Sequence, residues 1–230
     1  MTATDSTASL SRPATTTPPI AAGGGWAWAG ALGGLLGVAG LMVTGNLYDV
    51  ETGVVADNAA LAAAIAERAP LVWAQQALCA VVATCLVVFA AGLRRHLAAQ
   101  EPAGSLVPQV AATGVGLTAV ALLVGGGIST ELYWALTGPQ PFDPDTIGAH
   151  VAIYNTMAWL WGGLALSAGA VALGGLRRGS VGRLLALFSA LMAVLLAATQ
   201  VLPVQYIAVV PGALWLIGMG AAMARRTTHS

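Results

Sequence analysis

The sequence predicts an all-α polytopic membrane protein, a helix bundle with six transmembrane helices and both termini in the cytoplasm. Three observations lead to this prediction. The 230 residues are 57% hydrophobic and only 8% charged, whereas soluble globular domains carry about 25% charged residues. The mean hydropathy is +0.80, which is typical of a chain whose solvent is lipid. Long apolar runs recur along the chain, and most arginines fall in alternate connections between them.

The chain opens with a polar segment, and the first apolar run follows it. Residues 1–25 are rich in Thr, Ser, Ala, Pro and Gly without apolar periodicity, which predicts a disordered cytoplasmic tail. The run at about 26–45 is longer than the apolar core of a secretory signal, which has about 7–15 residues. We therefore expect it to be a retained transmembrane helix. Its glycines recur four residues apart, as at Gly30 and Gly34, a spacing that lets membrane helices pack closely.

Five further apolar runs complete a transmembrane domain at 26–226. Each is long enough, at about 1.5 Å per residue, to cross roughly 30 Å of hydrocarbon. No charge separates the last two runs, but one helix from Arg183 to Arg225 would be about 63 Å long, so we expect two crossings with a turn near Pro203. A short cytoplasmic tail at 227–230 follows. The five runs cover about residues 70–93, 108–136, 149–175, 183–201 and 204–224.

The two connections opposite the arginine-rich side have structure of their own. In the first, Asp57 can cap a short helix on the membrane surface, with Leu61 and Ile65 on one face. The second reads TGPQPFDPDTIG at 137–148, which predicts a loop held by prolines.

The placement of charge predicts the orientation. Eight of the nine arginines lie in the tails or in connections on one side, and only Arg68 lies on the other. Because cytoplasmic loops of membrane proteins are enriched in basic residues, we expect both termini in the cytoplasm and the protein in the plasma membrane. The acidic residues of the opposite connections are Asp49, Glu51, Asp57, Glu67, Glu131, Asp143 and Asp145.

Several classes of function are excluded by residue types. The chain has no lysine, which excludes a Walker A loop and Schiff-base chemistry. The formal net charge is zero and no basic tract is present, so nucleic acid is not an expected partner. Cys79 and Cys85 would be separated by about 9 Å along one helix and cannot bridge each other, so we expect two buried thiols.

Polar side chains within the spans gather in the half of the bilayer away from the arginines. This distribution predicts an outer-leaflet polar pocket, whereas the inner half is almost entirely apolar. Membrane lipids and a small amphiphilic ligand or a membrane-protein partner are the expected partners, with the oligomeric state left open. The candidate ligand-binding residues are Gln75, Gln76, Glu131, Tyr133, Trp134, His150, Tyr154, Asn155 and Gln205.

Glu131 is the candidate catalytic residue. If the third helix continues to Leu136, this carboxylate lies about one turn below the outer rim, where an unpaired charge costs up to ~3 kcal/mol and implies a partner. If the helix ends at Ser129, Glu131 is solvated, and Tyr133 and Trp134 are interface anchors. The sequence leaves both alternatives open.

Metal and cofactor sites have weak support. Asp143, Asp145 and His150 could ligate a divalent cation with Glu131 as a fourth ligand, but the spacing matches no EF-hand or HExxH pattern, so a plain acidic loop is favoured. No cofactor is evident. A haem held by two histidines is disfavoured, because His96 lies on the cytoplasmic side with His229 whereas His150 lies outside.

Three tryptophans fall near the middle of their spans, away from the interface belts where tryptophan is usually found. Packing inside the bundle would explain Trp159, Trp161 and Trp215. Together with the glycines at 125–127, which leave empty volume, they could instead line an outward-opening apolar cavity.

The order of these features resembles a known group of proteins. The segments ADNAALAAAIAERAP, GLRRHL and GGLRRGSVGRLLALFSAL, together with the glycine-rich first span, are similar to bacterial six-span membrane proteins of unknown function common in actinobacteria. The likeness in layout and composition covers about residues 26–226. It implies the six-span architecture and carries over no activity or catalytic residue.

Three functions are compatible with these features. The first is a binding or accessory bundle whose polar pocket holds a lipid-like molecule or docks a partner protein. The second is an intramembrane enzyme that acts on a lipid-like substrate through Glu131 or a metal at Asp143, Asp145 and His150. The third is a small proton- or cation-coupled transporter, which the apolar inner half disfavours because a pathway needs polar groups in both leaflets. We expect binding, and whether any reaction is catalysed stays open.

Overall fold

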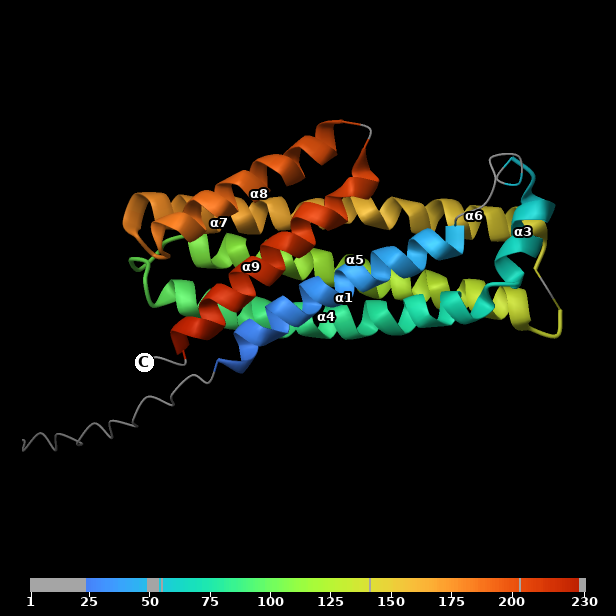
Figure 1. Ribbon diagram of the computed structural model, residues 1–230, viewed down its shortest axis with the longest axis horizontal. Helices are drawn as coiled ribbons and strands as arrows, with labels where there is room; N and C mark the ends of the chain where they lie inside the picture. The colour runs from blue at the N-terminus through green and yellow to red at the C-terminus, as the bar shows by residue number, and fades with distance from the viewer. Residues whose placement is uncertain (1–23, 49–53, 55, 141, 203, 228–230) are drawn as a thin grey trace, which may run out of the picture.

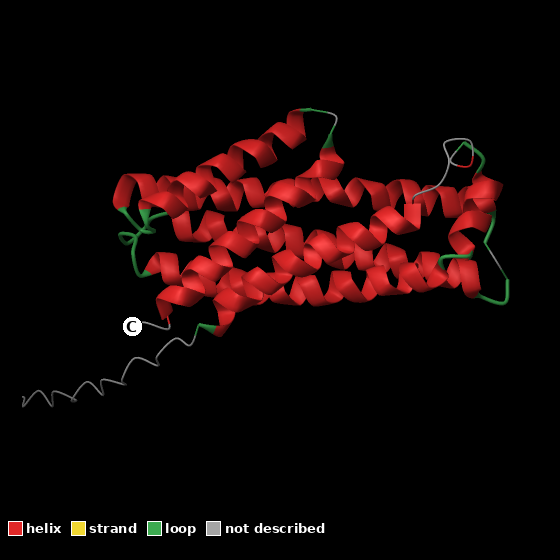
Figure 2. Ribbon diagram, viewed as in Figure 1, coloured by secondary structure: helices red, strands yellow, loops and turns green. Residues whose placement is uncertain are grey.

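The apolar runs of the chain form helices, and the described residues contain no strand (Figure 2). The computed structural model describes residues 24–48, 54, 56–140, 142–202 and 204–227. The predicted tails at 1–25 and 227–230 lie almost entirely outside these residues. The helices are α1 (Gly25–Tyr48), α3 (Asn58–Ala66), α4 (Ala69–Ala98), α5 (Val107–Thr137), α6 (Pro144–Asn155), η1 (Thr156–Gly162), α7 (Gly163–Arg178), α8 (Arg183–Val201), η2 (Gln205–Ala208) and α9 (Val209–Thr227).

Five helical segments are long and apolar enough to cross a membrane, which indicates a multi-pass membrane protein. Four of them correspond to α1, α4, α5 and α8, and the fifth is the continuous run of α6, η1 and α7 at Pro144–Arg178. The sixth predicted span corresponds to an apolar helix that is shorter, Val209–Arg225.

The helix boundaries follow local signals. Asp57 caps α3 as predicted, since its side chain accepts a hydrogen bond from the backbone N–H of Ala59 at 2.9 Å. The fourth span begins at Pro144 and not near residue 149, because Asp143 caps it by accepting from the N–H of Thr146 at 3.3 Å. The predicted loop at 137–148 is therefore partly helical.

The bundle has two distinct ends (Figure 1). At one end lie the start of α1, the end of α9, and the connections from α4 to α5 and from α7 to α8. We name it the arginine end for Arg94, Arg95, Arg177, Arg178 and Arg183. The opposite end carries α3 and the beginning of α6, and we name it the cap end.

The buried apolar side chains form two clusters. The main core fills the bundle with large buried side chains such as Phe89, Leu164 and Trp215. A second cluster lies at the cap end, where α3 and α6 pack on the ends of α4 and α5. Its buried members are Leu61, Ile65, Val72, Leu132, Ala135, Ile147 and Val151.

Helix α1 packs between α4 and α9 (Figure 1), and its glycines permit this contact. A Cβ on Gly34 would stand 2.7 Å from the backbone oxygen of Ala213 in α9, and a Cβ on Gly30 would overlap the ring of Phe89 in α4. Both glycines therefore lie where α1 contacts a neighbouring helix, and their role in membrane packing stays a prediction.

Candidate functional site

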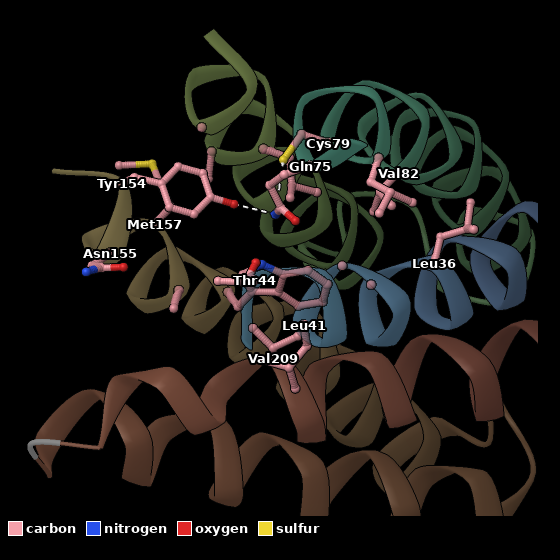
Figure 3. A pocket seen from close by; sticks show the side chains of 18 residues that line it. Leu36, Leu41, Thr44, Gln75, Cys79, Val82, Tyr154, Asn155, Met157 and Val209 are labelled. Atoms are coloured by element: carbon pink, nitrogen blue, oxygen red, sulfur yellow. Dashed lines mark hydrogen bonds between the residues drawn. The ribbon is translucent and has the colours of Figure 1, made fainter. Parts of the chain in front are cut away.

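A cavity of about 110 Å³ lies inside the bundle, where α1 faces α6 and η1 (Figure 3). Its walls are mostly apolar, and its polar side chains come from α1, α4 and α6. No charged residue is among the described residues that line it. The lining includes Leu36, Gly37, Gly40, Leu41, Thr44, Gln75, Leu78, Cys79, Val82, Ala121, Leu122, Gly125, Tyr154, Asn155, Met157, Ala158, Trp161 and Val209.

A hydrogen bond between Gln75 and Tyr154 forms the polar side of this cavity. Gln75 Nε2 donates to the Tyr154 hydroxyl, which links α4 to α6, and the dashed line in Figure 3 marks this bond. The same nitrogen lies 3.9 Å from the Sγ of Cys79, one turn along α4. Gln75 is only 6% exposed and Tyr154 only 8%, so the pair is shielded from the surroundings of the bundle.

The other amide atom of Gln75, Oε1, differs from Nε2 in its surroundings. Oε1 is buried and makes no hydrogen bond within the part of the chain that the structure describes. In Figure 3 it points away from Tyr154, toward the side of the cavity that α1 forms. Exchanging the amide oxygen and nitrogen would still leave one polar atom there, because only one of them can meet Tyr154. A buried polar atom without a hydrogen bond costs about 1–3 kcal/mol, so a ligand that supplies the missing bond would be favoured.

Small residues and an irregular helix create the open volume. A Cβ on Gly40 would meet no atom within 4 Å, and one on Gly125 would meet Met157 Cγ only at 3.4 Å. The 3₁₀ helix η1 interrupts the span between α6 and α7 and contributes Met157 and Trp161. Irregular backbone at membrane depth is tolerated where protein buries it or where it lines a cavity, and η1 satisfies this condition.

The cavity is polar toward the cap end and apolar toward the arginine end. Gln75 precedes Arg95 by 20 residues on α4, which corresponds to about 30 Å of helix and roughly the thickness of a hydrocarbon core. Val82 lies about 10 Å closer to the arginines. The amide of Gln75 and the arginines of α4 are therefore separated by about one hydrocarbon thickness along the helix, and the apolar walls of the cavity lie between them.

Three of the predicted ligand-binding residues, Gln75, Tyr154 and Asn155, line the cavity. Gln76, next along α4, is half-buried and does not, and the side chain of Gln205 lies outside the described residues. Thr44 also lines the cavity and was missed by the sequence analysis. It lies one turn after Gly40 on the same helix face, a spacing that could have indicated it.

Glu131 lies outside the cavity. Helix α5 continues beyond it to Thr137, so the alternative in which the helix ends at Ser129 is wrong. The side chain is nevertheless exposed, and α5 places it about 36 Å from the helix start at Val107, beyond the roughly 30 Å of a hydrocarbon core. The neighbouring rings of Tyr133 and Trp134 pack edge to face with centroids 5.6 Å apart.

Asp143, Asp145 and His150 make separate local contacts instead of converging. Asp143 caps α6, and Asp145 accepts a hydrogen bond from Asn58 Nδ2 in α3 at 2.8 Å. His150 Nδ1 lies 2.8 Å from the backbone oxygen of Thr146. Over the described ranges no group of three His, Cys, Asp or Glu side chains could hold a metal ion. The candidate metal site at these residues is therefore not formed.

Of the three mid-span tryptophans, only Trp161 lines the cavity. Trp159 is 49% exposed on the outside of the bundle. Trp215 is fully buried in the main core, where its Nε1 donates to the Ser189 hydroxyl at 3.1 Å. A cavity beside Gly125 is present, as one of the two alternatives allowed, but neither Trp159 nor Trp215 lines it.

A second polar cluster at the arginine end was not predicted. Glu101, in the connection between α4 and α5, is buried, and its Oε2 accepts hydrogen bonds from Arg178 Nη1 at 2.5 Å and from Ser105 Oγ at 2.8 Å. Its Oε1 and the Ser180 hydroxyl are both buried against Gly174 without a bond of standard geometry. An acidic residue among arginines is an unusual feature of this side, and it could have indicated the cluster.

Comparisons with protein-family models, curated proteins and solved structures find no match to this chain. The resemblance to actinobacterial six-span proteins therefore stays a prediction.

Proposed function

We propose that this chain binds a small, neutral amphiphile in the cavity beside Gln75 and Tyr154, taking it from the outer leaflet of the plasma membrane. The observation that carries the proposal is the buried, unpartnered Oε1 of Gln75 in a cavity with otherwise apolar walls. A ligand that donates one hydrogen bond to this oxygen and packs its apolar part against Leu41 and Trp161 would match both the polar atom and the apolar walls.

The proposal includes six transmembrane spans, with the arginine end and both termini in the cytoplasm. The concentration of arginines at one end supports this orientation. The sixth span would be η2 followed by α9, whose 4 and 19 residues give about 8 Å and 28 Å of helix. This length suffices to cross roughly 30 Å of hydrocarbon.

The chemistry of the cavity defines the class of ligand. No charged side chain lines its described walls, and burying a carboxylate or phosphate there would be strongly unfavourable. The volume of about 110 Å³ is smaller than a 150 Å³ cavity that accepts benzene. It therefore holds a hydroxyl or amide head, either of which can donate a hydrogen bond to Gln75 Oε1, with the first few carbons, and a longer chain would extend into the lipid. A long-chain or isoprenoid alcohol has this chemistry.

Binding is favoured over the two alternative functions. An enzyme acting through Glu131, or through a metal at Asp143, Asp145 and His150, would use residues that lie apart from the cavity. A proton- or cation-coupled transporter would need polar or charged groups along a pathway, and the cavity offers them only near Gln75. No observation favours either alternative.

Two probes of equal chain length test the proposal. Dodecanol and dodecanoate are added separately to the purified full-length protein in a mild non-ionic detergent, and native mass spectrometry measures retention. We expect one dodecanol to bind at least about tenfold more tightly than dodecanoate, because the cavity has no cation to offset the buried carboxylate. Equal affinities would contradict the proposal.

A pair of glycine variants locates the bound probe. Gly40→Leu places a side chain in the cavity, where a Cβ meets no atom within 4 Å, and Gly127→Leu adds the same side chain on the exposed face of α5. Dodecanol binding should fall at least about tenfold in Gly40→Leu and stay unchanged in Gly127→Leu. Equal binding by the two variants would show that dodecanol binds elsewhere.

A further inference from the structure

A groove of about 570 Å³ lies between α8 and α9 at the arginine end, far from the Gln75 cavity. In Figure 1 the two helices diverge from their η2 turn toward this end. Its walls are apolar except for one cation at its end. The groove is lined mainly by Arg183, Leu184, Leu185, Phe188, Gly218 and Ala222.

The floor and walls of the groove come from side chains of very different size. Gly218 and Ala222 lie one turn apart on α9 and contribute almost no volume. The Phe188 ring lies over Gly218, since a Cβ there would stand 2.8 Å from Phe188 Cε1. Leu184 is 84% exposed at the rim. The result is an open groove on the surface of the bundle with mostly apolar walls.

Charge at the mouth of the groove is positive, and no described residue compensates it. Arg183 is the first residue of α8, is exposed, and makes no ion pair with any described residue. Arg94, Arg95 and Arg177 are also exposed at this end, and Glu101, the one carboxylate among the described residues there, is already engaged by Arg178. An anion at the mouth of the groove would therefore be favoured.

We propose that this groove binds an anionic phospholipid from the leaflet at the arginine end. One acyl chain lies along Phe188 and over Ala222, and the phosphate accepts hydrogen bonds from the Arg183 guanidinium. The net negative charge of the lipid matters, because the choline group of a zwitterionic lipid would be repelled by the surrounding arginines.

The dimensions of the groove favour a lipid over a second copy of the chain. On α8 the groove extends from Gly182 to Phe188, about 10 Å of helix. A stable protein interface buries about 800 Å² on each partner, which requires a much longer stripe of contact. A single acyl chain is much narrower than a protein surface, so part of it can lie in a groove of this length.

Native mass spectrometry of the full-length protein with added dioleoyl lipids tests this site. Phosphatidylglycerol is compared with phosphatidylcholine, so that the acyl chains are identical and only the headgroups differ. We expect the first phosphatidylglycerol to bind at least about tenfold more tightly, and Arg183→Gln to abolish most of this preference. Ala222→Leu, which fills the apolar part of the groove, should weaken the first binding event for both lipids.

Arg177→Gln is the matched control, because it removes an exposed arginine of the same end that does not line the groove. It should leave the preference for phosphatidylglycerol unchanged, and circular dichroism should show equal helix content in all variants. Equal affinity for the two lipids in the wild type, or an equal loss in Arg177→Gln and Arg183→Gln, would overturn the proposal. A dimer that dissociates in Ala222→Leu would assign the groove to a second copy instead.

Discussion

Glu101 is a buried carboxylate at the arginine end, and it pairs with Arg178. Burial alone would raise the pKa of its carboxyl, but the hydroxyls of Ser105 and Ser180 and the guanidinium of Arg178 outweigh this effect and lower the pKa below the ordinary 4.5. The ionised carboxylate joins the connection after α4 to the end of α7. A connection and a helix end are thereby held together by two residues that are 77 positions apart in sequence.

Replacing this carboxylate should destabilise the protein in a pH-dependent manner. Glu101→Gln should lower the free energy of unfolding by about 1–3 kcal/mol near neutral pH, because Arg178 and Ser105 lose a charged acceptor. Since the folded pKa is lowered, the stability from Glu101 is present above the unfolded value of 4.5 and is lost as the pH falls through the folded value. The difference between wild type and variant should therefore shrink below about pH 4.5.

Unfolding in mixed micelles, followed by circular dichroism from about pH 7 to about pH 3.5, measures this difference. Glu131→Gln is the control, since the exposed Glu131 should change the free energy of unfolding by no more than about 0.5 kcal/mol. A pH-independent loss in Glu101→Gln would show that packing, and not charge, explains its effect.

At the residue scale, the signal in the sequence was a polar side chain that stands out in an apolar run, and three side chains with this signal line the cavity. Gln75, Tyr154 and Asn155 were found in this way. Glu131 stood out equally, yet it is exposed. Neighbouring residues on a helix point about 100° apart, so which of them faces a cavity depends on the packing partner. A single sequence does not specify that partner.

At the scale of elements, the contact between α1 and α9 is determined by glycine. The Cβ of any other residue at Gly34 would stand 2.7 Å from Ala213 O and from Ile217 Cγ1. The Ala213 oxygen is a backbone atom, so this contact can be relieved only if the two helices move apart. Helices that lack a hydrophobic drive in lipid depend on such close approach.

Gly34→Ala should therefore separate the two helices. We expect the free energy of unfolding to fall by about 1–3 kcal/mol, as is typical of overpacking. Gly116→Ala, where a Cβ meets no atom within 4 Å, should be neutral or stabilise by up to about 1 kcal/mol through helix propensity. Unfolding of both variants in mixed micelles measures this contrast. An unchanged stability of Gly34→Ala would mean that α1 and α9 are less closely packed.

The long helices were predictable, and the irregular ones were not. Spans such as α4 and α5 follow from apolar runs, because about 20 such residues are required to cross a bilayer. η1 has the same apolar composition as its flanking helices, so nothing in the pattern distinguishes it. Its 3₁₀ geometry is a property of the packed bundle, where Met157 and Trp161 meet the cavity.

At the scale of the whole molecule, the helices differ in length. α5 has 31 residues and α8 has 19, about 46 Å and 28 Å respectively. α8 therefore matches the hydrocarbon thickness of roughly 30 Å, whereas α5 exceeds it. The part of α5 that exceeds this thickness lies at the cap end, where α3 and α6 contribute to a separate hydrophobic cluster. The cap is expected to lie in the headgroup region and the water beyond it.

Cysteine labelling tests this arrangement. In a background with Cys79→Ala and Cys85→Ala, Gln140→Cys at the cap end should react with a membrane-impermeant maleimide in intact cells. Ala103→Cys, in the connection at the arginine end, should react only after the membrane is permeabilised. Both positions are exposed, so access depends on the side of the membrane. Labelling of both from outside would contradict the proposed orientation.

The seven residues of η1 also fix the rotational phase between α6 and α7. Each residue of a 3₁₀ helix turns the chain by about 120°, against about 100° in an α-helix. Over η1 the difference accumulates to about 140°. One span can thus turn Ile147 into the cap cluster and Leu164 into the main core. A ligand in contact with Met157 and Trp161 would touch η1, which sets this rotation. Its binding would therefore be coupled to the rotation of α6 relative to α7, and so to the relative orientation of the cap cluster and the main core.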